Sequence, residues 1–207
     1  MMRKILSGFF IFFGTLLLVV AILIVVENRT EQTEAENISM EVLEQLEPVI
    51  EAIKTAEARK DPTTAADIPD FQRNPDMEMP TTIVNGTEYV GTLEIPVLEL
   101  NLPVVNTSTK ANLKKSPCRY SGTPYMNNLI IGAHNYKAHF GRLKKLTYGT
   151  NVIFTDLDGN VFEYTVADIE TLQPYQLDDL VGSDWPLTLY TCTVGGQSRV
   201  VVRCEKS

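Results

Sequence analysis

Three patterns of apolar and polar positions follow one another along the chain, and each predicts a different kind of element. Residues 5–26 are mostly apolar and carry no charged side chain. As a helix these 22 residues span about 33 Å, enough to cross a hydrocarbon core of roughly 30 Å. The run is longer than the apolar part of a secretory signal, and no clear cleavage site closes it. We therefore expect a cytoplasmic tip and an uncleaved transmembrane anchor over residues 1–26, with a cleaved signal as the alternative.

The second pattern has a helical period. Over residues 38–59, aliphatic side chains recur at helical spacing with glutamates between them. Pro48 lies inside this pattern and is expected to kink or divide the helix. We prefer an acidic stalk that lifts the rest of the chain off the membrane; the alternative is a helix that packs on the following domain or pairs with a second copy. Residues 61–80 hold four prolines and few aliphatic side chains, so residues 27–81 are predicted to be a helical stalk and linker.

The third pattern begins at residue 82, where short apolar or alternating runs are separated by turn residues. Asp158-Gly159 between two of these runs is a strong hairpin signal, and helical patterns are limited to residues 108–115 and 138–146. The runs lie at residues 89–95, 98–105, 128–133, 152–155, 161–166, 187–192 and 199–204. Many short strands and few helices predict that residues 82–207 form one all-β domain, either a closed barrel or a sandwich.

Charge sets the expected orientation of the anchor. Arg3 and Lys4 precede the apolar run, whereas residues 27–80 carry 5 basic and 14 acidic side chains. Because positive residues stay on the cytoplasmic side, we expect a single-pass protein of the cell membrane whose C-terminal domain is extracellular. The net charge is −8 and no basic stripe occurs, so we expect no nucleic-acid partner.

Composition limits the chemistry of the domain. Three cysteines are too few and too far apart for a disulfide framework, and Cys118 and Cys204 are expected to be separate buried or edge thiols. With two histidines and no CxxC or HxxxH spacing, we expect no metal site and no cofactor.

Cys192 draws attention because it ends a strand-like run, TLYTC, and Arg199 returns after a Gly195-Gly196 turn. A cysteine at such a position is often only a small buried hydrophobe. Cross-strand geometry would nevertheless bring the guanidinium within several ångströms of the sulfur, where a cation favours thiolate or holds an oxyanion. His134 ends the run NLIIGAH in the same way, so the three residues make a set suited to acyl transfer. His139 follows in a polar loop and is expected at the surface.

The motifs around these residues resemble those of sortases, the membrane-anchored cysteine transpeptidases of Gram-positive bacteria. TLYTC resembles the family's TLxTC motif, and LIIGAHN resembles its strand ending in Gly-x-His. HFGRLKKLTYGTNVIF resembles its F-x-x-L-x-x-L-x-x-G-x-x-V/I segment, and SRVVVR resembles the strand that opens with its active-site arginine. The motifs occur in family order over residues 85–207. The resemblance implies a closed barrel of about eight strands with a few short helices.

The resemblance also implies roles for the three residues. Cys192 would be the nucleophile, His134 the general acid and base, and Arg199 the group that steadies the oxyanion and the substrate backbone. Arg203 competes for the last role, but it lies about 13 Å further along its strand. The implied reaction cleaves an LPxTG-like sorting signal between Thr and Gly through a thioester. An amine, such as a peptidoglycan precursor or a pilin lysine, then takes the acyl group, which attaches the surface protein to the cell wall.

Substrate contacts are expected from Thr191, Ala133 and Trp185, the last of which would line the groove. Trp185 could equally pack in the core, and a regular strand would turn Thr191 to the opposite face, where its hydroxyl packs or orients. The segment that sets specificity in the family corresponds to residues 172–186, which are too few for the long inserted helix of class B. No clear lid motif precedes the domain and no second span follows it, which weighs against class C and favours a class D-like or unclassified enzyme.

Three other interpretations are kept open. The first is a sortase that polymerises pilins. The second is a membrane-tethered β-domain without enzymatic activity that binds wall components. The third is another cysteine acyltransferase, an L,D-transpeptidase, but that family places its cysteine after a His-Gly pair, which does not precede Cys192.

Overall fold

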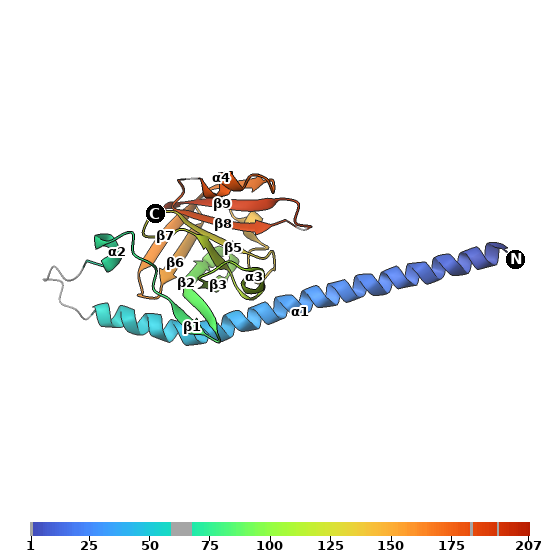
Figure 1. Ribbon diagram of the computed structural model, residues 1–207, viewed down its shortest axis with the longest axis horizontal. Helices are drawn as coiled ribbons and strands as arrows, with labels where there is room; N and C mark the ends of the chain where they lie inside the picture. The colour runs from blue at the N-terminus through green and yellow to red at the C-terminus, as the bar shows by residue number, and fades with distance from the viewer. Residues whose placement is uncertain (1, 59–67, 183, 194) are drawn as a thin grey trace.

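A single long helix carries the apolar run and continues without a break into the acidic segment. The computed structural model describes residues 2–58, 68–182, 184–193 and 195–207. Helix α1 (Met2–Ala58) includes Pro48 in its interior, so the proline does not divide the helix. The N-terminal part of α1 projects away from the rest of the molecule (Figure 1). Its most apolar stretch has a mean hydropathy of 2.5 and none of that stretch is buried, so α1 is long and apolar enough to cross a membrane.

The C-terminal half of α1 packs on the domain instead of standing free as a stalk. Val42, Leu46 and Ile50 lie on one face of the helix and are at most 5% exposed. They share a buried cluster with side chains of the domain: Val84, Tyr89, Val105, Cys118 and Leu157. Burying each aliphatic side chain contributes about 1.5–3 kcal/mol, enough to hold the helix against the domain. The preferred stalk interpretation is therefore wrong for this segment, and the packed helix is correct.

The domain is a closed β-barrel. Its strands are β1 (Thr82–Val84), β2 (Thr87–Ile95), β3 (Leu100–Val105), β4 (Cys118–Ser121), β5 (Leu129–Ala133), β6 (Asn151–Asp156), β7 (Val161–Leu172), β8 (Leu187–Cys192) and β9 (Arg199–Lys206). They are ordered β1-β2-β3-β4-β5-β8-β9-β7-β6, and β6 pairs back with β2. Eight strands therefore close the barrel and β1 is a short addition at the edge of β2. The β2–β6 pairing confirms the barrel and excludes the sandwich.

Short helices decorate the barrel: α2 (Asp70–Arg73), α3 (Lys110–Lys115), α4 (Leu177–Val181) and two 3-10 turns at Pro96–Leu98 and Leu143–Lys145. All seven predicted strand runs form strands, and the 108–115 helix is present. The helix expected over residues 138–146 is reduced to the second 3-10 turn. Part of the predicted linker is ordered, because Phe71 of α2 stacks on Tyr125 at 4.9 Å between ring centroids. Residues 59–67 of that linker lie outside the described residues.

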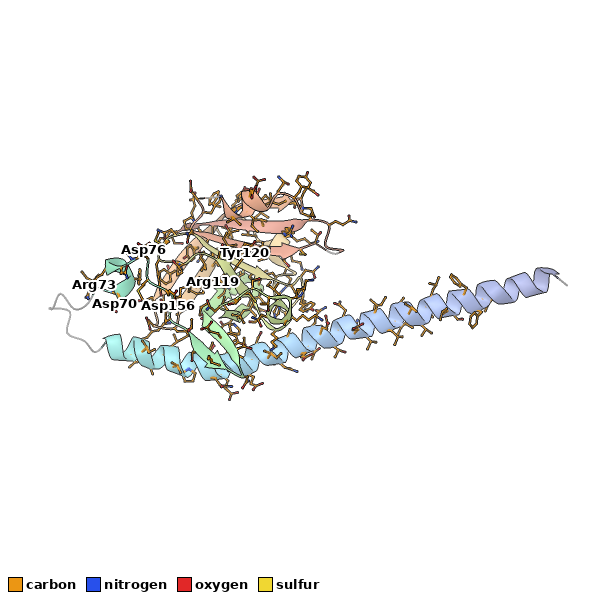
Figure 2. All side chains as sticks on the ribbon, in the orientation of Figure 1. Asp70, Arg73, Asp76, Arg119, Tyr120 and Asp156 are labelled. Carbon is orange, nitrogen blue, oxygen red and sulfur yellow. The ribbon has the colours of Figure 1, made fainter. Side chains whose placement is uncertain are left out.

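The predicted Asp158-Gly159 turn joins β6 to β7 and is organised by the fully buried Asp156. Its carboxylate accepts hydrogen bonds from the Tyr125 hydroxyl at 2.7 Å and from both the backbone and side-chain amides of Asn160. Gly159 adopts a left-handed φ of 81°, which favours glycine. Asp156 lies at the α2 end of the barrel, near Asp70 (Figure 2).

Apolar side chains fill the barrel and two outer clusters. The interior includes Leu93, Phe154 and Leu189. One outer cluster lies under α1, and the other joins Leu172, Leu180 and Val201 under α4.

Candidate active site

Neighbouring strands bring the three candidate catalytic residues to one end of the barrel. Cys192 ends β8 and is the cross-strand partner of Arg199, which opens β9. On the other side of β8, Thr191 pairs with Ala133 of the parallel strand β5, so His134 follows in line with Cys192. Adjacent strands lie about 4.8 Å apart and paired residues point to the same face. Cys192 is therefore flanked by His134 on one side and Arg199 on the other.

Thr191 and Ala133 hold β5 to β8 beside this set. The Thr191 hydroxyl donates a 2.8 Å hydrogen bond to the Ala133 carbonyl. Thr191 is 3% exposed and Ala133 6% exposed, and Ala133 belongs to the barrel core. The two side chains therefore lack the exposure that a substrate contact needs, and we correct their expected role from substrate binding to strand positioning. The orienting hydroxyl considered for Thr191 matches this geometry.

The turn between β8 and β9 fixes the Cys192–Arg199 pair. The Thr193 amide donates to the Ser198 carbonyl at 2.8 Å, and the Ser198 amide donates to the Thr193 hydroxyl at 3.1 Å. Gly195 and Gly196 have φ values of 85° and 70°, in the left-handed region that glycine enters without strain. The two glycines thus let a short turn hold the sulfur and the guanidinium on neighbouring strands.

Cys192 differs from the other two cysteines in its exposure. All three are free thiols, but Cys118 and Cys204 are buried and Cys192 is exposed. Burial raises the pKa of Cys118 and of Cys204 to about 12, so both remain protonated and inaccessible. The prediction of two separate buried thiols is confirmed, and the interpretation of Cys192 as a buried hydrophobe is excluded.

The competing arginine, Arg203, is occupied elsewhere. It is 2% exposed and forms an ion pair with Glu170 at 2.8 Å. Its guanidinium also donates to the Thr188 hydroxyl and to the backbone carbonyls of Asp179 and Leu180. Arg203 therefore ties α4 to the sheet, while Arg199 is the arginine next to Cys192.

His134 is half-buried and lies against an aromatic neighbour. Its ring stacks on Tyr136, with centroids 5.0 Å apart and planes at 26°. Burial lowers the pKa of His134; Glu31 raises it, and Lys114 lowers it further. The imidazole is therefore biased toward its neutral form, which can accept a proton.

His139 is fully buried, so the expectation of a surface position is wrong. The loop after β5 folds back on itself, with the His139 amide donating to the Tyr136 carbonyl at 3.0 Å and the Phe140 amide to the His134 carbonyl at 3.2 Å. Burial lowers the pKa of His139 to about 4. The loop is polar in sequence, but its tight turn directs the His139 side chain inward.

Two tyrosines beside Cys192 were missed by the sequence analysis. Tyr190 precedes Cys192 by two residues and so shares its face of β8. Its ring covers Gly132, where an added Cβ would lie 2.4 Å from the ring. Tyr120, on β4, meets Tyr190 edge-on with centroids 5.8 Å apart. The period-2 alternation could have revealed Tyr190; nothing in the local sequence indicated Tyr120.

Trp185 lies at the opposite end of β8 from Cys192. It precedes the first residue of β8, Leu187, and is half-buried. Seven residues of extended chain separate it from Cys192, or about 23 Å. The segment before it, residues 172–186, contains a single helical turn, α4, as expected from its length.

Metal-ligating side chains do not cluster in the part of the chain that the structure describes. Within it, no group of three or more His, Cys, Asp or Glu side chains could hold a metal ion. The chemistry available at this end of the barrel is that of a thiol, an imidazole and a guanidinium.

Comparison with known proteins gives a consistent result. Residues 93–207, more than half of the chain, match the family model described as a sortase domain. Sortase A of Bacillus anthracis is 23% identical over 150 residues, covering 69% of this chain and 70% of that protein.

Solved structures share the fold. A sortase C from Streptococcus pneumoniae matches with a TM-score of 0.56 and 22% identity, covering 77% of this chain and 96% of that one. A sortase D5 transpeptidase from Clostridium perfringens matches with a TM-score of 0.55 and 19% identity, covering 78% of this chain and 98% of that one. The fold of this chain is therefore shared with sortases of more than one class.

Proposed function

Because this chain belongs to the sortase family, we propose that it is a cysteine transpeptidase acting on an LPxTG-like sorting signal. The observation that carries the proposal is the exposed thiol of Cys192, paired across β8 and β9 with Arg199 and in line with His134 at the end of β5. The acceptor is an amine outside the cell, such as that of a peptidoglycan precursor, and the product is a surface protein joined to the wall. A pilin lysine is the alternative acceptor.

The first half-reaction cleaves the peptide. The Cys192 thiolate attacks the threonine carbonyl carbon, forming a C–S bond and a tetrahedral oxyanion next to the Arg199 guanidinium. The C–N bond to glycine then breaks. The proton on the His134 imidazolium passes to the departing amine, which leaves as a neutral group. A thioester between the threonine acyl group and Cys192 remains.

The second half-reaction reverses these roles. The acceptor amine attacks the thioester carbonyl, and the now neutral His134 takes up the proton that the amine loses. The C–S bond breaks, an amide forms, and the thiolate and imidazolium are restored for the next cycle. Water competes with the amine for the thioester, so shielding by the bound peptide favours transfer over hydrolysis.

Burial of His134 has a kinetic consequence. The first half-reaction needs the imidazolium, whereas burial lowers the pKa of His134 and favours the neutral ring. Few molecules therefore carry both thiolate and imidazolium at neutral pH. We expect slow turnover.

The proposed cellular arrangement follows from α1. With Arg3 and Lys4 on the cytoplasmic side, the anchor directs the barrel outward. The single turn of α4 before β8 is too short for the long inserted helix of class B, and we propose a class D-like or unclassified enzyme. We also propose that Trp185, at the far end of β8, contacts the substrate.

A peptide assay with the full chain in detergent tests the proposal. A library of fluorogenic sorting peptides is mixed with the protein and hydroxylamine, and mass spectrometry follows the acyl adduct on the protein. We expect hydroxylamine-dependent cleavage and an adduct on Cys192, and we expect Cys192→Ala, His134→Ala and Arg199→Ala each to abolish turnover. Cys118→Ala serves as the matched control, because it removes a buried thiol and should retain activity.

Two results would contradict the proposal. Cleavage that persists in Cys192→Ala would assign the reaction to another nucleophile. An intact library with the wild-type protein would favour a tethered domain that binds wall material without chemistry.

A further inference from the structure

We propose that Glu31 of the membrane-anchored helix is a positioning residue for His134 and acts through Tyr136. The inference rests on the proposed function for the role of His134 as acid and base. The contacts from which it is argued do not depend on any substrate. It makes α1 part of the active-site support in addition to its role as an anchor.

The carboxylate of Glu31 joins three elements of the fold. One oxygen accepts a 2.7 Å hydrogen bond from the Tyr136 hydroxyl, and the other accepts a 2.6 Å bond from the Lys114 ammonium. Tyr136 belongs to the loop that begins at His134, and Lys114 belongs to α3. The next helical residue, Gln32, accepts from the Lys137 amide at 3.4 Å. Two successive side chains of helix α1 therefore hold this loop in place. Each of them lies 105 residues from its partner in the sequence.

The Tyr136 ring links the contact with α1 to the imidazole of His134. Tyr136 is 6% exposed, and its ring lies near two imidazoles. His134 stacks on it at 5.0 Å, and the fully buried His139 lies 5.6 Å from it at an angle of 39°. Burial and the bond to Glu31 raise the pKa of Tyr136, so its hydroxyl remains a donor. A ring fixed at its hydroxyl and against His139 gives His134 one defined surface to stack on.

The ion pair alone would not justify this role. The Lys114 and Glu31 side chains are 58% and 33% exposed, and exposed ion pairs contribute little to stability. The buried tyrosine makes the difference, because a phenol at this depth needs an acceptor and Glu31 supplies it. Without that acceptor the Tyr136 hydroxyl has to bind water instead, and the Tyr136 ring moves away from the His134 ring.

Glu31 lies on α1 just beyond its apolar run. Glu31 follows the last residue of the apolar run, Val26, by five residues, about 7.5 Å along the helix axis. The β8–β9 turn lies at the end of the barrel from which the N-terminal part of α1 projects (Figure 1). The proposed acid and base is thus held by the segment that leaves the membrane, so the anchor and the catalytic end have a fixed relative placement.

A direct test reads the imidazoles by NMR in the full chain, held in detergent micelles and labelled at histidine Cε1. The chain has only two histidines, and His134→Ala assigns both signals. The charged groups facing His134 are Glu31 and Lys114, with His139 behind Tyr136. Because Glu31 raises the pKa of His134, both Glu31→Gln and Glu31→Ala are expected to lower it.

The two substitutions separate charge from position. Glu31→Gln retains an acceptor for Tyr136, so the ring-current shift of the His134 signal should stay near that of the wild type. Glu31→Ala removes the acceptor and should shift that signal toward the value in Tyr136→Leu, where the stack is gone. Glu44→Ala, an exposed position on the same helix, is the control and should change neither quantity. Unchanged His134 signals in Glu31→Ala would overturn the proposal.

Kinetics provide the second arm. If the wild type cleaves a sorting peptide, Glu31→Ala and Tyr136→Leu should lower kcat about tenfold with little change in KM, because a displaced acid loses part of its contribution. Glu31→Gln should recover most of that loss, and the acidic limb of its pH profile, which reports His134 when the imidazole loses its proton before the thiol, should move to lower pH. Full kcat in Glu31→Ala, with an active wild type, would contradict the positioning role. An inactive wild type would instead count against the proposed function, and the NMR result would still decide this inference.

Discussion

At the scale of single residues, burial decides what otherwise similar side chains do. Cys192, Cys118 and Cys204 share one chemistry, yet only the first is exposed. The two histidines lie five positions apart in sequence, but one stands at the strand end beside Cys192 and the other is wholly enclosed. The motif identified the exposed cysteine and the strand-end histidine, because both follow from where a strand stops. It did not indicate the enclosed histidine, because loop polarity says little about how a loop folds back.

The enclosed His139 should make stability depend on pH. Its folded pKa of about 4 lies below the ordinary value of 6.5, so the unfolded chain binds a proton that the folded chain refuses. Stability from this group is present above pH 6.5 and is lost as the pH falls toward 4. Between pH 7 and pH 5 the loss should be about 2 kcal/mol. Urea unfolding of the wild type and of His139→Gln at both pH values measures it, and equal pH dependence in the two proteins would contradict the assignment.

Asp156 should be a strong contributor to stability. Replacing it by alanine leaves the buried Tyr125 hydroxyl and the Asn160 amides without their acceptor, which should lower the free energy of unfolding by about 2–3 kcal/mol. Asp158→Ala is the matched control in the same turn, because its side chain is exposed and its backbone amide still donates to Asp156. Thermal unfolding of both variants gives the comparison. Similar melting temperatures would show that the turn holds without the buried carboxylate.

At the scale of elements, long-range packing changes the role of α1. Its helical period was visible in the sequence, and a free stalk and a packed helix share that period. Whether the helix packs on the domain depends on its partners in β1 to β4. These partners lie too far away in the sequence to be recognised from the residues around the helix. The same holds for strands β1 and β4, which were missed because three and four residues carry too little alternation to be recognised. Pairing with β2 and β5 makes them strands.

The packed face of α1 offers a matched pair of substitutions. Leu46 is 1% exposed and Val49 is 51% exposed on the same helix. Leu46→Ala should lower the free energy of unfolding of the domain by about 2–4 kcal/mol, because it leaves a cavity in the cluster under the helix. Val49→Ala should change it little. Denaturant unfolding of the full chain in detergent measures both, and equal effects would mean that the helix does not pack where the structure has it.

At the scale of the whole molecule, a helix long and apolar enough to cross a membrane, a barrel and an exposed thiol are joined in one chain. The helix lies along the barrel wall and then projects from the end where β8 stops and β9 begins (Figure 1). Cys192, His134 and Arg199 lie at that end. Such an arrangement suits a reaction that joins a peptide to an acceptor close to the cell surface. It also makes the orientation of the whole chain testable through a single side chain.

Cys192 provides that test. A membrane-impermeant maleimide added to intact Gram-positive cells should label the full chain once, because Cys118 and Cys204 are buried. Labelling should disappear in Cys192→Ala and persist in Cys118→Ala. Mass spectrometry of the isolated protein locates the adduct. Labelling that requires cell lysis would place the barrel on the cytoplasmic side and contradict the proposed topology.

The sequence by itself determined the apolar helix, seven of the nine described strands, and the ends of β5 and β8 where His134 and Cys192 stand. These features depend on periodicity and on residues close in the chain, so they can be read locally. Only the tertiary structure decided that α1 packs on the barrel, that His139 is buried, that Arg203 is committed to α4, and that Glu31 reaches Tyr136. Each of these depends on contacts between distant segments, and the free energy of such contacts is set by the partner surface, which local sequence does not contain.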